Sequence, residues 1–421
     1  HEMKKVLSYL LVILLLAPAL PLAITSATAY EKKIPCDADG NNELTKEELV
    51  NAILLHMLGE GDLKLDDVGD AAWVYVYWDG KPKTIVDDTV TDTYPDGKPI
   101  TIYRPPERII TLHSNSAEIL KLLKSKDKIV GIDKYISDEK FFFPDISKLP
   151  IVGSMSDPDA EEIIRLNPDI IIAYGSYFTK WSIYLENKLK GTGITLARLD
   201  CYKPETMSDD IIKLGHFLDR AEEAEEFVDW YEGYLSIIND RVEELTEDEK
   251  PIVYVEGYTD YKTYSEGTGA HQACIMAGGI NIAADLPGKY PKVDSEWVIN
   301  QSPDIIVKVV SSTKVSGGYG ENDPSEMKAV WEDIVNRDGW SDIPAVRDRK
   351  VYLIHAGGTW NDPKYFIGLA YLAKWFNSTL FEDVNPKVMH WEYLTEFQGL
   401  DYDLDKHGVF VYHPELHPDG K

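Results

Sequence analysis

The chain has 421 residues, of which 44% are hydrophobic, and this length predicts two large lobes plus a smaller appendage. Its formal net charge of -29 argues against a nucleic-acid or anionic-membrane partner, because both are bound through lysine and arginine. The three cysteines, Cys36, Cys201 and Cys274, are widely scattered. We therefore expect neither a disulfide framework nor a cysteine metal site.

Residues 1–29 have the pattern of a signal peptide. Lys4 and Lys5 precede an apolar run that ends in an Ala-Thr-Ala cleavage pattern. A transmembrane anchor is the alternative, but Pro18 and Pro21 interrupt the run. We therefore expect a secreted, extracytoplasmic protein associated with the cell surface.

Residues 30–70 contain an acidic loop typical of an EF-hand. The residues at positions 1, 3, 5, 7, 9 and 12 of the loop are Asp37, Asp39, Asn41, Glu43, Thr45 and Glu48. Such a ring of hard oxygens suits Ca²⁺, so we expect a structural calcium ion here. No helical pattern precedes the loop, and the unit therefore resembles half of a dockerin repeat. The alternative is an acidic loop that only caps the following helix.

Residues 71–107 are predicted to form a β lead-in to the first lobe. The segments "WVYVYWDGKPKTIVDDTV" and "DGKPITIYR" are rich in β-branched and aromatic residues and contain Asp-Gly turns. This pattern is typical of short strands joined by tight turns.

From residue 108 onward, short β-branched runs alternate with helical segments, which predicts an α/β fold. Near-continuous apolar runs such as "DIIIAYG" and "DIIVKVV" are typical of parallel sheets that are covered on both faces. We expect two Rossmann-like lobes with mainly parallel sheets, over residues 108–204 and 247–421. A sustained helical pattern over residues 205–246 predicts one long α-helix between them, which would restrict how far the lobes close.

One phrase occurs in both lobes. The segments "EEIIRLNPDIII" and "SEWVINQSPDIIV", aligned on Glu161 and Glu296, share the glutamate, two β-branched residues, Pro-Asp and a final apolar run. Each copy predicts a short helix that leads into a buried parallel strand, once in each lobe.

Ligands of open α/β sheets bind beyond the carboxyl ends of the strands, and here the loops at those ends are rich in tyrosine and tryptophan. Such a lining suits a bulky, flat or aromatic ligand with a few polar anchors. The candidate cleft residues are His113, Ser114, Asn115, Met155, Tyr174, Tyr177, Trp181, Arg198, Tyr202, Tyr258, Tyr261, Tyr264, His271, His355 and Trp360.

Two chemical alternatives apply to these cleft residues. A bare metal ion could be held by His113, His271 and His355, since neutral imidazole is a common transition-metal ligand. Alternatively, a histidine or tyrosine completes the coordination of a ferric complex, while Arg198 and Lys262 neutralise an anionic chelate.

Several segments resemble a known family. "PPERIITLHSNSAEILKLL", "EEIIRLNPDIII", "AGGINIAAD" and "SEWVINQSPDIIV" look like the class III periplasmic-type substrate-binding proteins of ABC importers for iron complexes, haem and cobalamin. The resemblance covers residues 96–412 and does not include the acidic loop. It implies a monomer that holds its ligand between two lobes and delivers it to a membrane permease dimer.

The resemblance also implies a role for the repeated phrase. Glu161 and Glu296 match the positions that engage arginines of the permease dimer in that family. Two carboxylates on equivalent helices would orient such a partner through two separate charge contacts. The alternative for each glutamate is a first-turn charge favoured by the helix dipole.

No catalytic motif accompanies these features. We find no G-x-S-x-G elbow, no H-E-x-x-H, no Walker loop and no dinucleotide fingerprint after a strand, so we expect no enzyme. The predicted function is capture of a metal chelate, foremost a ferric siderophore or haem, for an ABC importer. Cobalamin or a bare metal ion is the alternative ligand, and a calcium-dependent extracellular scaffold or adhesion protein is the alternative class.

Overall fold

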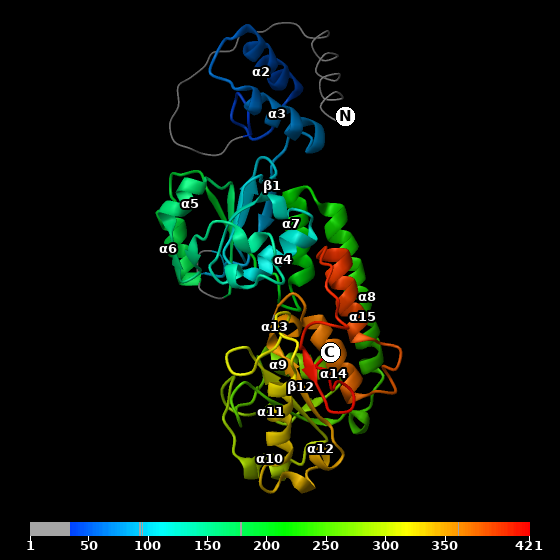
Figure 1. Ribbon diagram of the computed structural model, residues 1–421. Coiled ribbons are helices and arrows are strands. Elements are labelled where there is room, and N and C mark those ends of the chain that lie inside the picture. The colour runs from blue at the N-terminus through cyan, green and yellow to red at the C-terminus, as the bar shows by residue number, and fades with distance from the viewer. Residues whose placement is uncertain (1–33, 92–93, 95, 177–178, 361) are drawn as a thin grey trace.

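The computed structural model describes residues 34–91, 94, 96–176, 179–360 and 362–421. The predicted signal peptide and the candidate cleft residue Tyr177 lie outside these ranges. Within them, no helix is both long and apolar enough to cross a lipid bilayer. The chain forms an N-terminal helical module and two α/β lobes, which follow one another along the molecule (Figure 1).

The N-terminal module consists of two packed helices, and an antiparallel hairpin links it to the first lobe. These elements are α2 (Lys46–Leu58), α3 (Leu65–Tyr77), β1 (Lys83–Val86) and β2 (Pro99–Ile102). The prediction of strands at the start of residues 71–107 is wrong, because residues 71–77 complete α3. The buried positions of α3 follow helical spacing rather than alternation; they are Val68, Ala71, Ala72 and Val74.

The module contacts the first lobe at the amino ends of its strands. Arg104 pairs with Asp70 of α3 and lies 3.7 Å from a carboxylate oxygen of Asp169, which directly precedes β7. Asp169 also accepts hydrogen bonds from the N–H groups of Glu107 and Arg108 at 2.8 and 2.9 Å, just ahead of β3. The module therefore sits at the end of this lobe where the strands begin.

The first lobe is built on a four-stranded parallel sheet with the order β4-β3-β7-β8. Its strands are β3 (Ile109–Thr111), β4 (Ile129–Ile132), β7 (Ile170–Ala173) and β8 (Thr195–Arg198), and a small hairpin is formed by β5 (Gly153–Ser154) and β6 (Asp157–Pro158). Its helices are α4 (Ser114–Leu122), α5 (Ala160–Leu166) and α6 (Thr179–Lys188). Every residue of β3 and β7 is buried, as expected for central strands.

The second lobe has a five-stranded sheet with the order β10-β9-β11-β12-β13, in which only β13 is antiparallel to its neighbour. Its strands are β9 (Ile252–Glu256), β10 (Ile280–Asn281), β11 (Ile305–Val310), β12 (Val351–His355) and β13 (Val411–Tyr412). Its helices are α9 (Gly269–Met276), α10 (Ser295–Gln301), α11 (Ser325–Val335), α12 (Pro344–Arg347), α13 (Ala356–Thr359), α14 (Tyr365–Phe376) and α15 (Pro386–Glu392). The two mainly parallel sheets confirm the predicted α/β fold class.

Two helices, rather than the single helix predicted over residues 205–246, connect the lobes: α7 (Met207–Leu218) and α8 (Ala221–Glu243). The chain turns between them at Asp219, whose backbone is left-handed with a φ of 57°. Aspartate adopts this conformation more readily than most residues, so the break needs neither glycine nor proline. Helix α8 alone then runs along both lobes and contacts α4, α9 and α14 (Figure 1).

Candidate ligand-binding cleft

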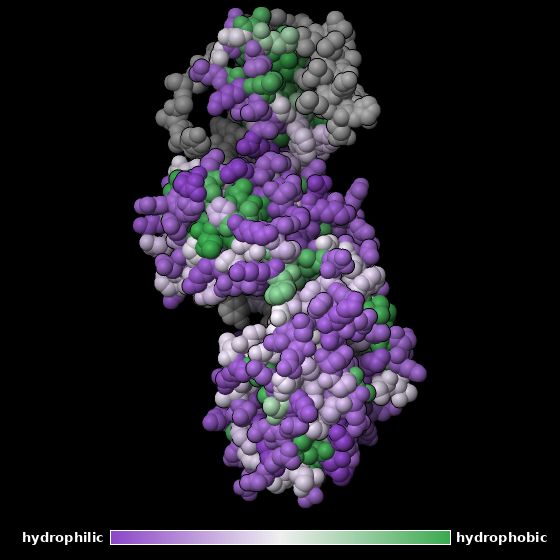
Figure 2. Space-filling view, viewed as in Figure 1, coloured by the Kyte–Doolittle hydropathy of each residue, from purple (hydrophilic) through white to green (hydrophobic). Residues whose placement is uncertain are grey.

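A cavity of about 600 Å³ lies between the two lobes, where the molecular surface narrows (Figure 2). The first lobe contributes the segments that follow β3, β7 and β8, through Asn115, Tyr174 and Tyr202. The second lobe contributes the loop after β9, helix α9 and the first turns of α14. The cavity therefore lies at the carboxyl ends of strands from both sheets, which is the expected place for a ligand in this architecture.

Six of the predicted cleft residues line the cavity: Asn115, Tyr174, Tyr202, Tyr258, Tyr264 and Trp360. The sequence pattern misses other lining residues, among them Pro204, Met276, Tyr290, Tyr365 and Leu369. Tyr365 and Leu369 lie one turn apart at the start of α14, directly after the "HAGGTW" loop. The helix that follows a cleft loop was a signal available in the sequence, whereas Tyr290 carries none.

The lining is aromatic and carries one charge. Six of the lining residues are tyrosines, and Lys262 is the one charged side chain among the described residues that face the cavity. Lys262 is exposed, and its Nζ lies 5.7 Å from the ring centroid of Tyr290. Flat aromatic faces beside a single cation suit a planar ligand that carries an anionic group.

His113 is buried beneath the cavity rather than exposed in it. Its Nδ1 accepts a hydrogen bond from the Ser116 N–H at 3.1 Å, and its ring stacks on Tyr174 with the centroids 3.9 Å apart. Burial lowers the pKa of His113 to about 4, so its imidazole is neutral at pH 7. The neutral ring of His113 therefore packs against the ring of Tyr174 and presents no charge to a ligand.

The remaining described candidates lie outside the cavity lining: Ser114, Met155, Trp181, Arg198, Tyr261, His271 and His355. Arg198 is fully buried and donates hydrogen bonds to Ser182 and Glu186 at 2.8 Å each. Tyr261 lies under the guanidinium of Arg337, 4.7 Å from the ring centroid. The side chains of Arg198 and Tyr261 therefore make their contacts within their own lobes. Other residues of the same loops line the cavity.

The three histidines do not form a metal site. Among the described residues, the one group of His, Cys, Asp or Glu side chains close enough to share a metal ion is Asp37, Asp39 and Glu48. His355 Nδ1 accepts the Gly357 N–H at 3.1 Å, and His271 bonds to the Asn281 side chain at 3.0 Å. The prediction of a metal ion held jointly by these imidazoles is therefore wrong, because local hydrogen bonds occupy each ring in a different place.

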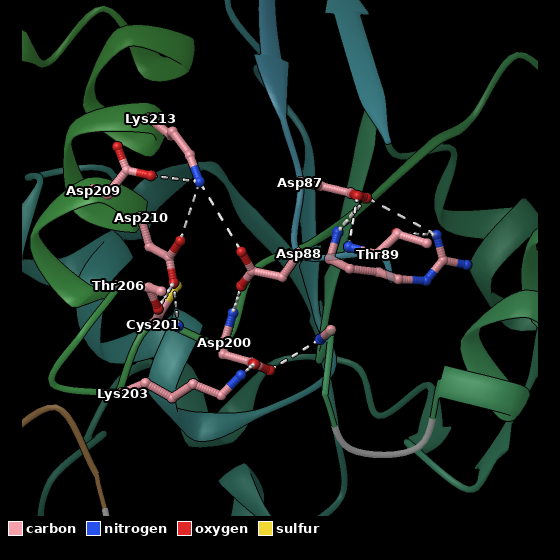
Figure 3. Close-up of polar contacts among 12 residues, drawn as sticks. Asp87, Asp88, Thr89, Asp200, Cys201, Lys203, Thr206, Asp209, Asp210 and Lys213 are labelled. Atoms are coloured by element: carbon pink, nitrogen blue, oxygen red, sulfur yellow. Dashed lines mark hydrogen bonds and ion pairs between the residues drawn. The ribbon is translucent and has the colours of Figure 1, made fainter. Parts of the chain in front are cut away.

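A buried carboxylate supports the loops of the first lobe (Figure 3). Asp200 Oδ1 accepts hydrogen bonds from the N–H groups of Gly175 and Ser176 at 3.0 and 3.1 Å, and its Oδ2 lies 2.6 Å from Lys203 Nζ. These contacts join the loop after β7 to the loop after β8. Both loops carry a tyrosine of the cavity lining, so Asp200 fixes one wall of the cavity.

A second buried carboxylate supports the facing loop of the second lobe. Glu256, at the end of β9, is fully buried and pairs with Lys308 at 2.6 Å and with Arg337 at 2.7 Å. Lys308 also lies 2.8 Å from Asp260, which belongs to the loop that reaches the cavity after β9. In each lobe, a charge buried at the end of a strand is paired and holds a cavity loop in place.

The glutamates of the repeated phrase occupy equivalent positions in the two lobes. Glu161 and Glu296 are exposed in the first turns of α5 and α10, and each helix begins at an aspartate N-cap, Asp159 and Asp294. The two helices are far apart, one in each lobe (Figure 1). The sequence repeat is therefore also a repeat of local structure: cap, exposed glutamate, helix and buried strand.

In the acidic loop of the N-terminal module, three carboxylate side chains lie close together. The ligand atoms of Asp37, Asp39 and Glu48 lie within 4.8 Å of one another. Asn42 is left-handed with a φ of 62° at the sharp turn, where EF-hands carry glycine. Thr45 caps α2 by accepting the Glu48 N–H at 3.3 Å. Three of the six predicted calcium ligands, Asp37, Asp39 and Glu48, therefore cluster in this loop, and the alternative helix cap is present as well.

Two lobes with parallel sheets, a helical connector and an aromatic cavity between the lobes define a two-lobed binding protein. Residues 109–357, more than half of the chain, match the family described as periplasmic binding protein. The chain belongs to this family. The match begins after the N-terminal module and the β1–β2 hairpin.

Individual relatives agree with this assignment. The chain is 27% identical over 256 residues to the uncharacterized ABC transporter substrate-binding lipoprotein YvrC of Bacillus subtilis, covering 60% of this chain and 74% of that protein. It is 26% identical over 237 residues to a cobalamin-binding protein of Halobacterium salinarum, covering 54% and 60% of the two chains. The TroA-like periplasmic binding protein FepB from Veillonella parvula superimposes with a TM-score of 0.69 at 26% identity, over 79% of this chain and 99% of that structure.

The family sets the class of activity. The chain is a substrate-binding protein of the kind that serves ABC transporters, and it is not an enzyme. Both conclusions confirm what the motifs predict.

Proposed function

We propose that the chain captures a metal chelate, foremost a ferric siderophore or haem, in the interlobe cavity and delivers it to an ABC importer outside the cytoplasm. The cavity lining supports this proposal: six tyrosines and Trp360 surround one lysine, Lys262. The cavity volume of about 600 Å³ falls in the range of small-molecule sites. Aromatic faces stack on a flat chelate, and Lys262 pairs with one of its carboxylate or other anionic oxygens.

Cobalamin is the second candidate ligand. The relatives from Halobacterium salinarum and Vibrio cholerae are named cobalamin-binding and vitamin B12-binding proteins. The corrin ring of cobalamin carries amides where haem carries carboxylates, so Lys262 contributes less to its binding. A bare metal ion has weaker support, because the described residues that line the cavity include neither a carboxylate nor a histidine.

Titration of the purified chain with haemin, the ferric hydroxamate ferrioxamine B and cyanocobalamin tests the ligand class. We expect one of the three probes to bind with one-to-one stoichiometry. Quenching of the tryptophan fluorescence measures this binding. Lys262→Gln should weaken the binding of an anionic probe by roughly tenfold or more, since a charge-assisted hydrogen bond contributes about 1.5–3 kcal/mol. Lys292→Gln is the matched control, because Lys292 is exposed but lies outside the lining. Binding of none of the three probes would refute the chelate proposal.

We further propose Glu161 and Glu296 as the contact points for the permease dimer. Their exposure and equivalent positions on α5 and α10 support this role. The double variant Glu161→Ala with Glu296→Ala should bind ligand normally but no longer stimulate ATP hydrolysis by the reconstituted importer. Glu162→Ala is the control, because Glu162 is on the same helix and pairs with Arg165 at 2.6 Å. Full stimulation by the double variant would refute the assignment.

For the N-terminal module, we propose that the loop of Asp37, Asp39, Asn41, Glu43, Thr45 and Glu48 binds one structural Ca²⁺ ion. The cluster of Asp37, Asp39 and Glu48 oxygens supports this proposal. Calorimetric titration with Ca²⁺ should show binding in the range of extracellular calcium modules, about 10⁻⁴–10⁻³ M, and Glu48→Gln should abolish it. Absence of binding at millimolar Ca²⁺ would leave the loop as a helix cap and remove the basis of the scaffold alternative.

A further inference from the structure

Residues 87 and 88 precede β3, the first strand of the four-stranded sheet, yet they lie along the edge of that sheet at β8. They directly follow β1, and the Asp88 N–H donates a hydrogen bond to the Arg198 carbonyl at 2.7 Å. In return, the Arg198 N–H donates to the Asp87 carboxylate at 3.1 Å. These bonds attach the segment that follows β1 to the end of β8, ahead of the loop that carries Tyr202 of the cavity lining.

The side chain of Asp88 extends this attachment to the cavity loops (Figure 3). Its Oδ2 accepts a hydrogen bond from the N–H of Asp200 at 2.8 Å. Asp200 lies two residues before Tyr202, in the loop after β8. The Asp200 carboxylate in turn accepts the N–H groups of Gly175 and Ser176. One series of hydrogen bonds therefore runs from Asp88 into both first-lobe loops that carry tyrosines of the lining.

Gly175 provides an independent observation of the same arrangement. A Cβ at Gly175 would lie 2.4 Å from the Cβ of Asp88 and 2.9 Å from its carbonyl oxygen. Any other residue at position 175 would displace either Asp88 or the loop after β7. The lack of a side chain at Gly175 therefore allows Asp88 to pack closely against the loop after β7.

We propose that Asp88 is a positioning residue for ligand binding, which fixes the loops of Tyr174 and Tyr202 without lining the cavity itself. One wall of the binding site thus depends on a segment that precedes the first core strand, β3, by about 20 residues. The proposal rests on the proposed function in one respect, namely that the interlobe cavity is the ligand site.

Hydrogen–deuterium exchange of the unliganded full chain tests the positioning without any ligand. Asp88→Ala should speed exchange of the Asp200, Gly175 and Ser176 amides by roughly tenfold or more, because their loops lose an anchor. Asp88→Asn keeps an acceptor oxygen and should restore most of the protection. Asp209→Ala is the matched control, because Asp209 belongs to the same charged cluster but contacts Lys213 at 2.7 Å on the exposed side.

Titration of the same variants links the loops to the ligand. Whichever of haemin, ferrioxamine B and cyanocobalamin binds the wild type should bind Asp88→Ala at least roughly fivefold more weakly, and Asp88→Asn almost normally. If Asp88→Ala does not fold, Asp88→Ser replaces it, since its hydroxyl is too short to reach the Asp200 N–H.

The outcomes separate this proposal from the proposed function. If none of the probes binds the wild type, the chelate proposal fails, and faster exchange still establishes the positioning by Asp88. Wild-type exchange rates in Asp88→Ala overturn the positioning in every case. Unchanged affinity for a probe that binds the wild type overturns its role in ligand binding.

Discussion

The Nζ of Lys364 lies 2.5 Å from a carboxylate oxygen of Glu118, and this ion pair joins the two lobes. Glu118 is on α4, one turn after Asn115, and Lys364 directly precedes Tyr365, so both partners adjoin residues that line the cavity. Both side chains are almost fully buried. The pair therefore fixes how the two walls of the cavity face each other.

Removing one partner of this pair should strongly destabilise the protein. Glu118→Ala leaves the buried ammonium of Lys364 with Asp362, at 3.1 Å, in place of two carboxylates, and Lys364→Met leaves the Glu118 carboxylate buried without a cation. Each should lower the free energy of unfolding by roughly 3–5 kcal/mol. Urea unfolding measures this loss. Small-angle scattering should show a larger radius of gyration, because α4 is no longer held by the second lobe.

The double variant Glu118→Leu with Lys364→Met separates charge from packing. Replacing both charges with apolar groups should recover most of the lost stability, since neither charge is then left alone. Glu162→Ala, which removes the solvent-screened pair of Glu162 with Arg165, is the control and should change stability far less. A double variant as unstable as either single variant would contradict the role given to the pair.

The aromatic lining predicts a large effect at Trp360. Trp360→Ala should weaken binding of the proposed chelate by roughly thirtyfold, because a buried tryptophan contact often contributes about 2 kcal/mol or more. The measurement is a titration monitored by ligand absorbance. Trp181→Ala serves as the control, because Trp181 is outside the lining. Equal losses in both variants would show that the ligand binds elsewhere.

The close contact at Gly175 predicts a cost in stability as well as in binding. Gly175→Ala places a methyl group within 2.4 Å of the Asp88 Cβ, and such overpacking should destabilise the chain by about 1–3 kcal/mol. Thermal unfolding followed by circular dichroism measures this. Gly233→Ala is the matched control, since nothing lies within 4 Å of a Cβ there and alanine favours the helix. A Gly175→Ala variant as stable as the wild type would contradict the packing described.

A pH dependence follows from Asp210. Burial, with a contribution from the charge of Asp88, raises the pKa of Asp210 to about 7, although Lys213 lies 3.5 Å away and opposes the shift. The unfolded chain titrates this group near about 3.9, so the folded state holds its proton more tightly. The stability gained from that proton is complete below about pH 4 and is lost as the pH rises through 7.

Asp210→Asn should therefore become more stable relative to the wild type as the pH rises from 5 to 8. Asparagine keeps an acceptor for the Cys201 N–H, which Asp210 binds at 3.0 Å, but removes the charge. Calorimetric melting temperatures across this range measure the effect. Asp209→Asn is the control, and a constant difference between Asp210→Asn and the wild type would refute the shift.

Local patterns predict much of this fold. The runs that become β7 and β11 are β-branched, apolar and short, and both are fully buried central strands. Residues 73–77 alternate valine with aromatic residues, which also favour strands, but they complete α3, because packing against α2 outweighs strand propensity. The break at Asp219 is also invisible in the sequence, since neither glycine nor proline marks it.

The candidate site is predicted less completely than the sheets. Residues of the loops after strand ends, such as Tyr174 and Tyr202, do line the cavity, because parallel strands deliver their loops to one edge. Glu118 and Lys364 are separated by 246 residues, and no local pattern records their contact. The histidines suggested a metal site that is absent among the described residues, because their loops reach the cavity while their rings form hydrogen bonds within the protein.

The N-terminal module and the cavity lie at opposite ends of the first lobe. Asp169, which contacts Arg104 at the module side, precedes β7, while Tyr174 follows the same strand at the cavity side. A cell-envelope component that grips the module would therefore hold the molecule by the end remote from its ligand. The first lobe would then separate the two contacts, so that a partner on the module would leave the cavity open to its ligand.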